Sequence, residues 1–443
     1  MTQRDTKEKR ASLHTHGCRL NQYETKVIRD RLESEGYRIV PFGEAADLGI
    51  VNTCTVTREA DSKCRQSIRQ FIRKNPKAIT VVVGCYSQSG YKELADIPGV
   101  DLILGNQDKL SVLDYIGTEK SEVPVIVRDR ISKEDFTINF VGDRPFNKRV
   151  NLKVQDGCDF MCTFCTIPFV RGRARSRDFD NLMEETRSLV SRGAREFVLT
   201  GVNIGTFLSQ GHSILELVDA LDAVPGVDRI RISSIEPTTI PVELFDRMKD
   251  PSHALLPYLH IPLQSGSDTI LKEMRRRYTC KEFLDFVELA QASVPGICIG
   301  SDILVGFPGE TQALFEETCQ FFLDSPLAYT HVFTYSEREG TPAARRADAI
   351  PMPERHRRSS HLRRLSAKKR HDYYASYLGE TVEVLFEDPR EDTWPGYTGN
   401  YMRVVVQSEE ELTNRLGQVK LERISADYLE GTLVAVEPLR CAP

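Results

Sequence analysis

The chain has 443 residues, of which 40% are hydrophobic and 28% charged, and its formal net charge is −5. This length predicts about two to four domains, and the charge gives no overall basic field for nucleic acid. No apolar run reaches the roughly 18 residues of a membrane-spanning helix, and the polar tail of residues 1–8 lacks a signal-peptide core. We therefore expect a cytoplasmic protein without a membrane segment, in which 11 cysteines indicate metal binding or catalysis rather than disulfides.

The first 125 residues alternate between short apolar runs and helical patterns. Predicted helices of about 15 residues, such as Asn21–Glu35, separate the runs. Strand–helix alternation predicts a parallel sheet with helices on its faces. The predicted strands are Arg10–Thr15, Asp47–Asn52, Ile79–Gly84 and Val100–Leu104.

Three cysteines follow three of these strands. Cys18, Cys54 and Cys85 each lie just past a carboxyl end, and such ends share one edge of a parallel sheet. We therefore expect the three thiols to meet at a metal site. Cys64 differs, because Ile68 lies four residues further along the same predicted helix face, which indicates a core residue. The remaining cysteines have no partner spacing and receive the same interpretation: Cys280, Cys298, Cys319 and Cys441.

A second set of thiols follows the apolar alternation of residues 150–154. Cys158, Cys162 and Cys165 place three soft ligands within eight residues, which suits an iron–sulfur cluster or three corners of a zinc site. A zinc site needs a fourth ligand, and no His or Cys follows at zinc-finger spacing. The spacing, with Phe164 before the third Cys, resembles the CxxxCxxC loop of the radical S-adenosylmethionine (SAM) enzymes. That resemblance implies a cluster whose open iron binds SAM.

Six strand-like runs with intervening amphipathic helices follow from residue 151 to residue 335. Six βα units are fewer than the eight of a closed barrel, so we expect a partial (βα)6 barrel with its active groups at the carboxyl ends of the strands. The loops there are small and polar, and together with Phe164 they predict a SAM pocket. The strands are Asn151–Gln155, Glu196–Thr200, Arg229–Ser233, Tyr258–Leu263, Ile297–Val305 and Thr330–Tyr335. The candidate cofactor-binding residues are Phe164, Thr200, Gly201, Ser233, Glu236, Gln264, Gly306, Pro308 and Gly309.

Two basic segments allow two interpretations each. Guanidinium groups directly after the cluster loop suit an anionic substrate, the alternative being surface charge beside a helix. The run of Arg and Lys between residues 345 and 371 is typical of a solvated helix face, with a phosphate-binding stripe as the alternative. The first segment contains Arg171, Arg173, Arg175 and Arg177.

The last 70 residues change to a β pattern. Glu380–Phe386, Tyr401–Val406 and Thr432–Glu437 alternate between apolar and polar residues, which predicts a small antiparallel barrel. Such modules often bind RNA, but this one is acidic, so phosphate contacts would fall on a limited patch. The candidates for that patch are Arg403, Arg415, Lys420 and Arg423.

Motifs over nearly the whole chain resemble those of the radical-SAM methylthiotransferases. The resemblance implies an α/β fold with an N-terminal domain (9–125) whose auxiliary [4Fe–4S] cluster is bound by Cys18, Cys54 and Cys85. It further implies a linker (126–148), a radical-SAM core (149–375) and a C-terminal TRAM domain (376–443), with no catalytic residue beyond the clusters. Tyr335 and Arg338, in a further matching motif, become candidate substrate contacts. The motifs are residues 17–25, 52–57, 84–85, 165–168, 263–267 and 335–343.

Within the family, residues 21–25 and 52–57 are most similar to the branch that modifies N6-threonylcarbamoyladenosine at position 37 of tRNA. The implied reaction uses two SAM molecules and a sulfide of the auxiliary cluster to insert a methylthio group at C2. The implied partners are the anticodon stem-loop and a reductant of the flavodoxin or ferredoxin type, and we expect a monomer. The alternatives are methylthiolation of isopentenyladenosine or of a ribosomal protein aspartate, and, in a different class, a non-catalytic metal- or RNA-binding scaffold.

Overall fold

The computed structural model describes residues 8–117, 119–140 and 149–438, so the predictions for the first seven residues, for linker residues 141–148 and for Cys441 lie outside it. The chain divides into two compact units. Unit 1 contains residues 1–143, 156–175 and 336–341, and unit 2 contains residues 144–155, 176–335 and 342–443. Within the described residues, none of the helices combines the length and the apolar character needed to cross a membrane.

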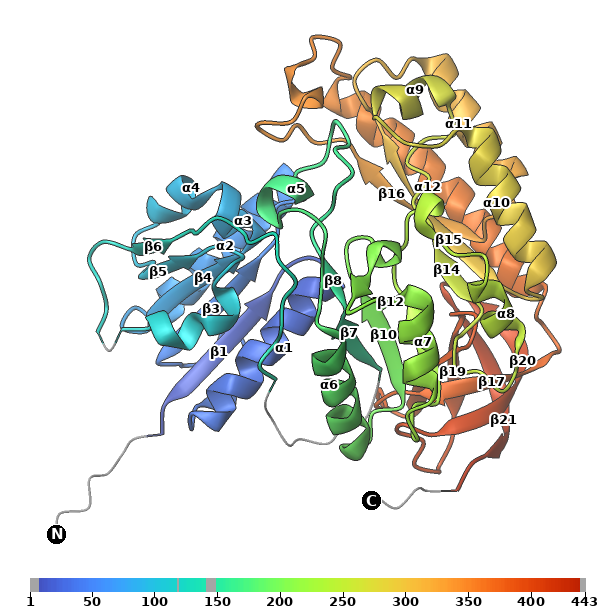
Figure 1. Ribbon diagram of the computed structural model, residues 1–443, viewed down its shortest axis with the longest axis horizontal. Helices are drawn as coiled ribbons and strands as arrows, with labels where there is room; N and C mark the ends of the chain where they lie inside the picture. Colours follow the sequence, from blue (N-terminus) through green and yellow to red (C-terminus); the bar gives the residue numbers. More distant parts are fainter. Residues whose placement is uncertain (1–7, 118, 141–148, 439–443) are drawn as a thin grey trace. The chain divides into compact units, whose positions relative to one another are not determined.

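Unit 1 is built on a six-stranded parallel sheet in the order β2-β1-β3-β4-β5-β6, blue to teal in Figure 1. β1 and β4 have the predicted bounds, whereas β2 and β6 are three-residue strands that the sequence did not predict. The strands are β1 (Arg10–Thr15), β2 (Arg38–Val40), β3 (Leu48–Thr53), β4 (Ile79–Gly84), β5 (Leu102–Leu104) and β6 (Val125–Val127). The helices are α1 (Arg19–Ser34), α2 (Arg58–Lys74), α3 (Cys85–Ser89), α4 (Tyr91–Ala95), the 3-10 helix η1 (Lys109–Tyr115) and α5 (Ile167–Val170).

Side-chain alternation along these strands produces two apolar layers. Ile50 packs with Ile28 and Leu32 of α1 on one face, whereas Val51 packs with Cys64 and Ile68 of α2 on the other. Both faces of a parallel sheet are buried, which explains the continuous apolar runs. The Cys64 side chain is fully buried in this core, as predicted.

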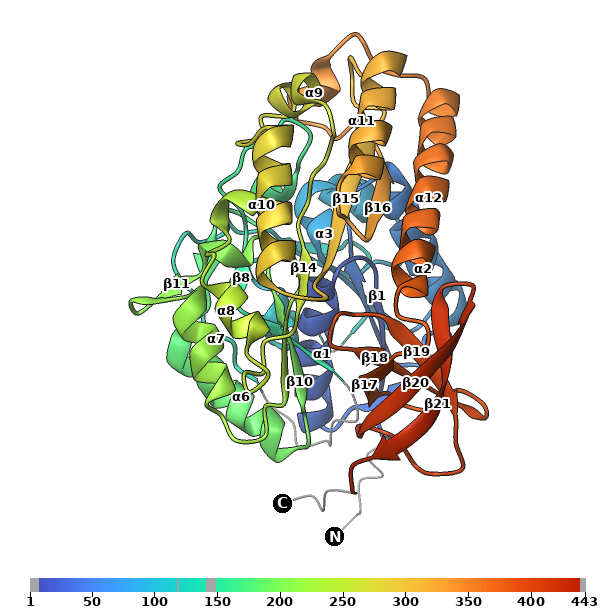
Figure 2. The same ribbon diagram turned by 90° about the vertical axis from the view of Figure 1, so that its right-hand side faces the viewer.

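Unit 2 contains six parallel strands in two three-stranded sheets, β13-β10-β7 and β14-β15-β16, which confirms the predicted partial barrel. Helices α10, α11 and α12 lie alongside β14–β16 in Figures 1 and 2. The strands are β7 (Val150–Lys153), β10 (Glu196–Thr200), β13 (Arg229–Ile232), β14 (Tyr258–His260), β15 (Cys298–Val305) and β16 (Tyr329–Thr334), with shorter β11 (Leu208–Ser209) and β12 (His212–Ser213). The two-residue strands β8 (Gln155–Asp156) and β9 (Arg175–Ser176) each have one residue in either unit. The helices are α6 (Phe179–Ser191), η2 (Ile204–Thr206), α7 (Ile214–Asp222), η3 (Pro237–Thr239), α8 (Leu244–Lys249), α9 (Asp268–Glu273), α10 (Cys280–Ser293), α11 (Gln312–Asp324), η4 (Ala343–Arg345) and α12 (Met352–Ala375).

The C-terminal part of unit 2 is a closed five-stranded barrel, drawn in red in Figure 2. Its core contains Trp394, Met402 and Leu412. Four strand pairs are antiparallel as predicted, whereas β19 and β21 pair in parallel and complete the barrel. The strands are β17 (Thr381–Phe386), β18 (Thr393–Thr398), β19 (Arg403–Gln407), β20 (Leu416–Ser425) and β21 (Tyr428–Val436).

A buried carboxylate, Glu196 at the start of β10, anchors the arginines that join the two parts of unit 2. Arg231 donates to Glu196 (2.9 Å) and to the Gly399 carbonyl (2.8 Å) of the C-terminal barrel. Arg229 pairs with Glu196 at 3.6 Å and donates to the Tyr397 carbonyl. Burial alone would raise the pKa of Glu196, but the charges of Arg231, Arg229 and Arg149 lower it below its ordinary value of 4.5.

Glu196→Gln is therefore expected to destabilise the protein by about 3–5 kcal/mol, because it leaves buried arginines without their counter-charge. Because the folded pKa is depressed, the contribution of Glu196 is fully present above pH 4.5 and is lost as the pH falls through the folded value. Urea unfolding at pH 7 and at pH 4 measures both effects. The matched control Asp285→Asn removes the exposed Lys281–Asp285 pair and should leave the urea midpoint nearly unchanged, whereas equal losses in both variants would contradict the anchor.

Candidate active site

The first three predicted thiols converge at one edge of the unit 1 sheet. Cys18 follows β1 by three residues, and Cys54 and Cys85 directly follow β3 and β4. The pKa of the Cys54 thiol is raised to about 12, mainly by burial and to a smaller extent by the nearby Cys85 and Cys18. Cys54 and Cys85 are buried, whereas Cys18 is exposed. The structure therefore brings together three soft ligands with one open side.

Glycines before two of these cysteines make the close approach possible. Gly17 (φ +95°) and Gly84 (φ +101°) both adopt the left-handed conformation that disfavours other residues. A Cβ on Gly17 would lie 2.9 Å from the Cys54 Sγ, and one on Gly84 would lie 2.5 Å from the Asn52 Oδ1. The space beside Cys54 is thus kept free of side-chain atoms, as a bulky inorganic group requires.

The second set of thiols lies on a loop in unit 1 whose backbone faces the sulfurs. The N–H groups of Phe160 and Ile167 donate to the Sγ atoms of Cys158 and Cys165, at 3.4 Å each. Hydrogen bonds of this kind stabilise thiolates that bind an iron–sulfur cluster. Cys162 is buried, and the other two thiols are half-buried.

Within the described ranges, no three His, Cys, Asp or Glu side chains converge closely enough to hold a single metal ion. The thiolates of a cluster bind different iron atoms and need not meet at one point. Both sets of thiols therefore have the ligand chemistry and the local surroundings that fit a cluster.

The two sets of thiols are connected inside unit 1. Asn106 donates through Nδ2 to the Cys85 Sγ (3.5 Å) and to the Val170 carbonyl (2.5 Å) in α5, which begins two residues after Cys165. Arg171 donates to Glu24 (3.1 Å) on α1, the helix that follows Cys18. The loop of Cys158 is thus held by the same residues that surround Cys85 and Cys18.

The four arginines after the cluster loop do not form the predicted anion site. Arg171 and Arg177 are 1% and 0% exposed and are paired with carboxylates, Arg177 with Glu185. The side chain of Arg175 is also mostly buried and lies 3.7 Å from Asp156. Buried guanidinium groups that already bind carboxylates cannot reach a substrate phosphate, so both predictions, substrate contact and surface charge, are wrong for these three. Arg173 is half-exposed and stays a candidate.

Tyr335 and Arg338, the other predicted substrate contacts, occupy different surroundings. Tyr335 is 2% exposed and packs against Phe307, so its ring belongs to the core of unit 2 and the prediction of substrate contact is wrong. Arg338 pairs with Asp61 at 2.7 Å and donates to Thr55, the residue after Cys54. Arg338 therefore lies within unit 1 beside the first set of thiols, where its contact with a substrate stays a prediction.

The predicted cofactor residues of unit 2 gather at the carboxyl ends of its strands. Thr200 ends β10, Ser233 directly follows β13 and Gly306 directly follows β15. Gln264 has φ +70° and forms a bridge to Ile303, which places its backbone at the same end. Gly306 and Gly309 instead make room for neighbouring side chains, since a Cβ would lie 2.4 Å from Arg355 and 2.7 Å from Arg346 respectively.

Asn203 is a polar residue in this region that the sequence did not single out. It is 1% exposed, accepts hydrogen bonds through Oδ1 from the Glu236 backbone and from Thr239, and its Nδ2 has no partner among the described residues. A buried donor without a partner is costly, so Asn203 fits a ligand with an acceptor such as the SAM carboxylate. Its position in the loop after β10 is the sequence feature that could have identified Asn203.

Two buried ion pairs were also missed. Glu236 pairs with Arg276, and His260 Nε2 lies 2.9 Å from the Asp302 Oδ1. Burial raises the pKa of Glu236, and the charge of Arg276 offsets only part of that rise. The sequence could not pair them, because the partners are about 40 residues apart.

The basic helix and the acidic barrel offer few free cations. On α12, Arg355 and Arg358 are buried, Arg358 pairing with Glu310, whereas Arg363 and Arg364 are exposed. In the C-terminal barrel, Arg415 donates to the Glu437 carbonyl and Arg423 pairs with Glu430. In both predicted phosphate patches, the exposed basic residues therefore stay candidates for phosphate contact, and the buried or paired ones do not.

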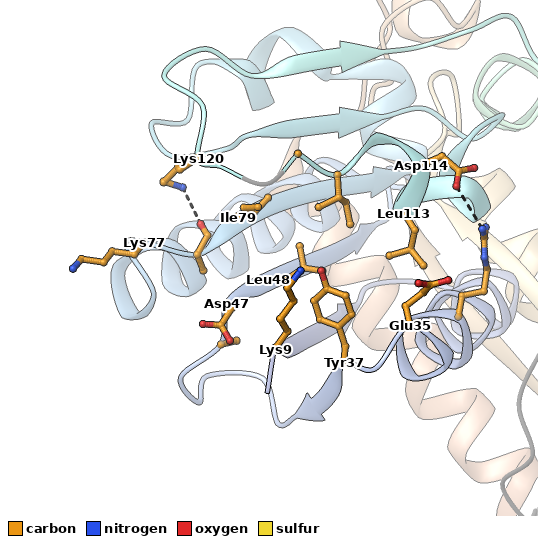
Figure 3. Close-up of a pocket in the computed structure, with 15 residues that line it drawn as sticks. Lys9, Glu35, Tyr37, Asp47, Leu48, Lys77, Ile79, Leu113, Asp114 and Lys120 are labelled. Carbon is orange, nitrogen blue, oxygen red and sulfur yellow. Dashed lines mark hydrogen bonds and ion pairs between the residues drawn. The ribbon is translucent and has the colours of Figure 1, made fainter. Parts of the chain in front are cut away.

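A pocket of about 730 Å³ in unit 1 lies away from the thiols. Figure 3 shows Asp47, Leu48 and Ile79 along its wall, all at the amino ends of strands, with Lys77 extending outward. Since the cysteines follow the carboxyl ends of the same strands, this pocket is not part of the candidate site.

A partial parallel barrel and a loop with three thiolates define a radical-SAM enzyme, and comparisons with known proteins agree. The model of the radical SAM superfamily matches residues 152–322, and that of uncharacterized protein family UPF0004 matches residues 10–105. The fold is similar to that of the radical SAM methyltransferase TsrM from Kitasatospora setae (TM-score 0.53, 16% identity, 76% of this chain and 77% of that one).

Curated relatives define the family more closely. The threonylcarbamoyladenosine tRNA methylthiotransferase MtaB of Bacillus subtilis is 39% identical over 96% of both chains. The tRNA-2-methylthio-N(6)-dimethylallyladenosine synthase of Anaplasma phagocytophilum is 32% identical over 96% of this chain and 98% of its own. The chain belongs to the radical-SAM methylthiotransferase family, and within it to the MtaB type.

Proposed function

We propose that this protein inserts a methylthio group at C2 of N6-threonylcarbamoyladenosine at position 37 of tRNA. The proposal is supported by the placement of Cys18, Cys54 and Cys85 at one edge of the sheet, in the compact unit that also contains the Cys158 loop. The greater identity to the MtaB relative than to the dimethylallyladenosine enzyme supports this nucleoside over isopentenyladenosine.

The cofactors of the proposed enzyme are two [4Fe–4S] clusters and SAM. When bound, SAM would supply the 5′-deoxyadenosyl radical that removes the C2 hydrogen atom and, from a second molecule, the methyl group, and the auxiliary cluster would supply the sulfur. Cys18, Cys54 and Cys85 would hold the auxiliary cluster, and Cys158, Cys162 and Cys165 the cluster that binds SAM. Phe164, half-buried beside Cys165, would limit access of water.

The substrate requires an accessible, unpaired base. RNA bases in single-stranded loops can be splayed out and read along their edges, so an anticodon loop can present such a base. Arg173 and Arg338 are the candidate contacts to its phosphates or base. A flavodoxin- or ferredoxin-type protein would supply the electron that SAM cleavage consumes, and the enzyme would act as a monomer in the cytoplasm.

Nucleoside mass spectrometry of tRNA from a strain that lacks this gene tests the proposal. We expect the methylthio derivative of threonylcarbamoyladenosine to disappear and to return when the gene is restored. A gene carrying Cys158→Ala should not restore it. Loss of the isopentenyl derivative instead would contradict the proposed substrate, and an unchanged nucleoside profile would contradict tRNA modification.

A further inference from the structure

Unit 1 contains a cluster of buried charges beside its thiols. Arg171 and Lys109 are each 1% exposed, Glu24 is 0% and Asp156 is 3% exposed. Arg175 lies 3.7 Å from Asp156 as a third cation, so the carboxylates of Glu24 and Asp156 offset most of the buried positive charge. The sequence gives no sign of this cluster, because Glu24 and Arg171 are 147 residues apart.

Arg171 is the centre of the cluster. Its Nη1 donates to Asp156 (3.0 Å) and to Glu24 (3.1 Å), and its Nη2 donates to the Asn21 side chain (2.6 Å). Lys109 completes the set by binding Glu24 and the Asn106 Oδ1. The planar guanidinium group of Arg has donors that point to all three partners at once. The compact ammonium group of Lys cannot bind partners in these three directions.

The partners of Arg171 come from both sets of thiols. Asp156 lies two residues before Cys158 and Arg171 six residues after Cys165, so their contact closes the base of the cluster loop. Asn21 and Glu24 lie in the first two turns of α1, directly after Cys18. The Asn21 Nδ2 also donates to the Thr53 carbonyl beside Cys54 (3.0 Å). One guanidinium group thus joins the loop of Cys158 to the segments that carry Cys18 and Cys54.

We infer that Arg171 is a positioning residue that fixes the loop of Cys158, Cys162 and Cys165 relative to Cys18, Cys54 and Cys85. The spacing between the two sets of thiols is then set inside one compact unit, which contains residues 156–175 together with residues 1–143. The catalytic consequence rests on the proposed function, because transfer of a methylthio group requires both sites at a fixed distance from one base.

Hydrogen exchange tests the inference on the full-length protein, reconstituted with iron and sulfide and again without them. In Arg171→Met, which has similar volume but no charge, amides of residues 158–170 should exchange about tenfold faster or more, with a smaller increase in Arg171→Lys. The matched control is Arg177→Met, which removes an equally buried arginine whose partner Glu185 lies in unit 2. Its exchange in residues 158–170 should match the wild type.

Unchanged exchange in Arg171→Met, or an equal increase in Arg177→Met, would overturn the inference. If Arg171→Met does not fold, Arg171→Lys decides by the same two criteria. In the reconstituted enzyme, Arg171→Met should raise the ratio of 5′-deoxyadenosine to methylthio product by about tenfold, because the base is no longer aligned with the sulfur. A wild-type enzyme that makes no methylthio product would contradict the proposed function but would leave the exchange result, and therefore the positioning role, intact.

Discussion

Cys18→Ala is expected to separate the two halves of the reaction. The loop of Cys158, Cys162 and Cys165 remains intact in this variant, so SAM should still be cleaved to 5′-deoxyadenosine at a rate within about tenfold of the wild type. Methylthiolated nucleoside should fall below detection, because the set of Cys18, Cys54 and Cys85 loses Cys18, its exposed ligand. Quantifying both products in the same reaction by mass spectrometry measures the split.

Cys158→Ala is the matched counterpart, since it should abolish both products. Cys64→Ala is the control for a buried thiol outside both sets, because Cys64 belongs to the core between β3 and α2. It should lose stability and retain the ratio of the two products. Normal methylthio product from Cys18→Ala would remove Cys18 from the auxiliary site.

Gly84→Ala is expected to have the second large effect, through the backbone that positions Cys85. A Cβ at Gly84 would lie 2.5 Å from the Asn52 Oδ1 and 2.6 Å from the Thr53 carbonyl oxygen, at φ +101°. Strain and overpacking together should cost about 3 kcal/mol and displace Cys85, so that bound iron falls from about eight to about four per chain. Urea unfolding and iron analysis after reconstitution measure the two effects.

Gly36→Ala provides the matched control for this strain. Gly36 has φ +82°, and no atom lies within 4 Å of a Cβ added there. It should lose on the order of 1 kcal/mol from the left-handed backbone alone and keep all of its iron. An equal iron loss in both variants would mean that global destabilisation, rather than the fit around Cys85, controls the cluster.

Local patterns predicted the elements that position the thiols. Apolar runs placed β1 and β4 at their observed bounds, and because parallel strands share one edge, the placement of Cys18, Cys54 and Cys85 at that edge followed from sequence. β2 and β6 are three residues long and mostly not buried, whereas the equally short β5, which was predicted, is fully buried. The parallel β19–β21 pair depends on closure of the barrel, which is not a local property.

Charged residues were harder to predict than thiols. Arg171 and Arg173 look alike in sequence, yet one is buried and the other half-exposed. Arg171 is buried because it pairs with Glu24 and Asp156. Glu24 is distant in the chain, so only the fold identifies it as a partner of Arg171. Asn203 and the His260–Asp302 pair were missed for the same reason: their roles depend on neighbours from other strands.

Iron bound after anaerobic reconstitution tests most directly whether six thiolates hold two clusters. We predict about eight iron atoms and about eight sulfides per chain in the wild type, and about four of each when Cys18, Cys54 and Cys85 are all replaced with Ala. About four iron atoms in the wild type, or zinc in place of iron at the first three thiols, would contradict the two-cluster enzyme and favour a metal-binding scaffold.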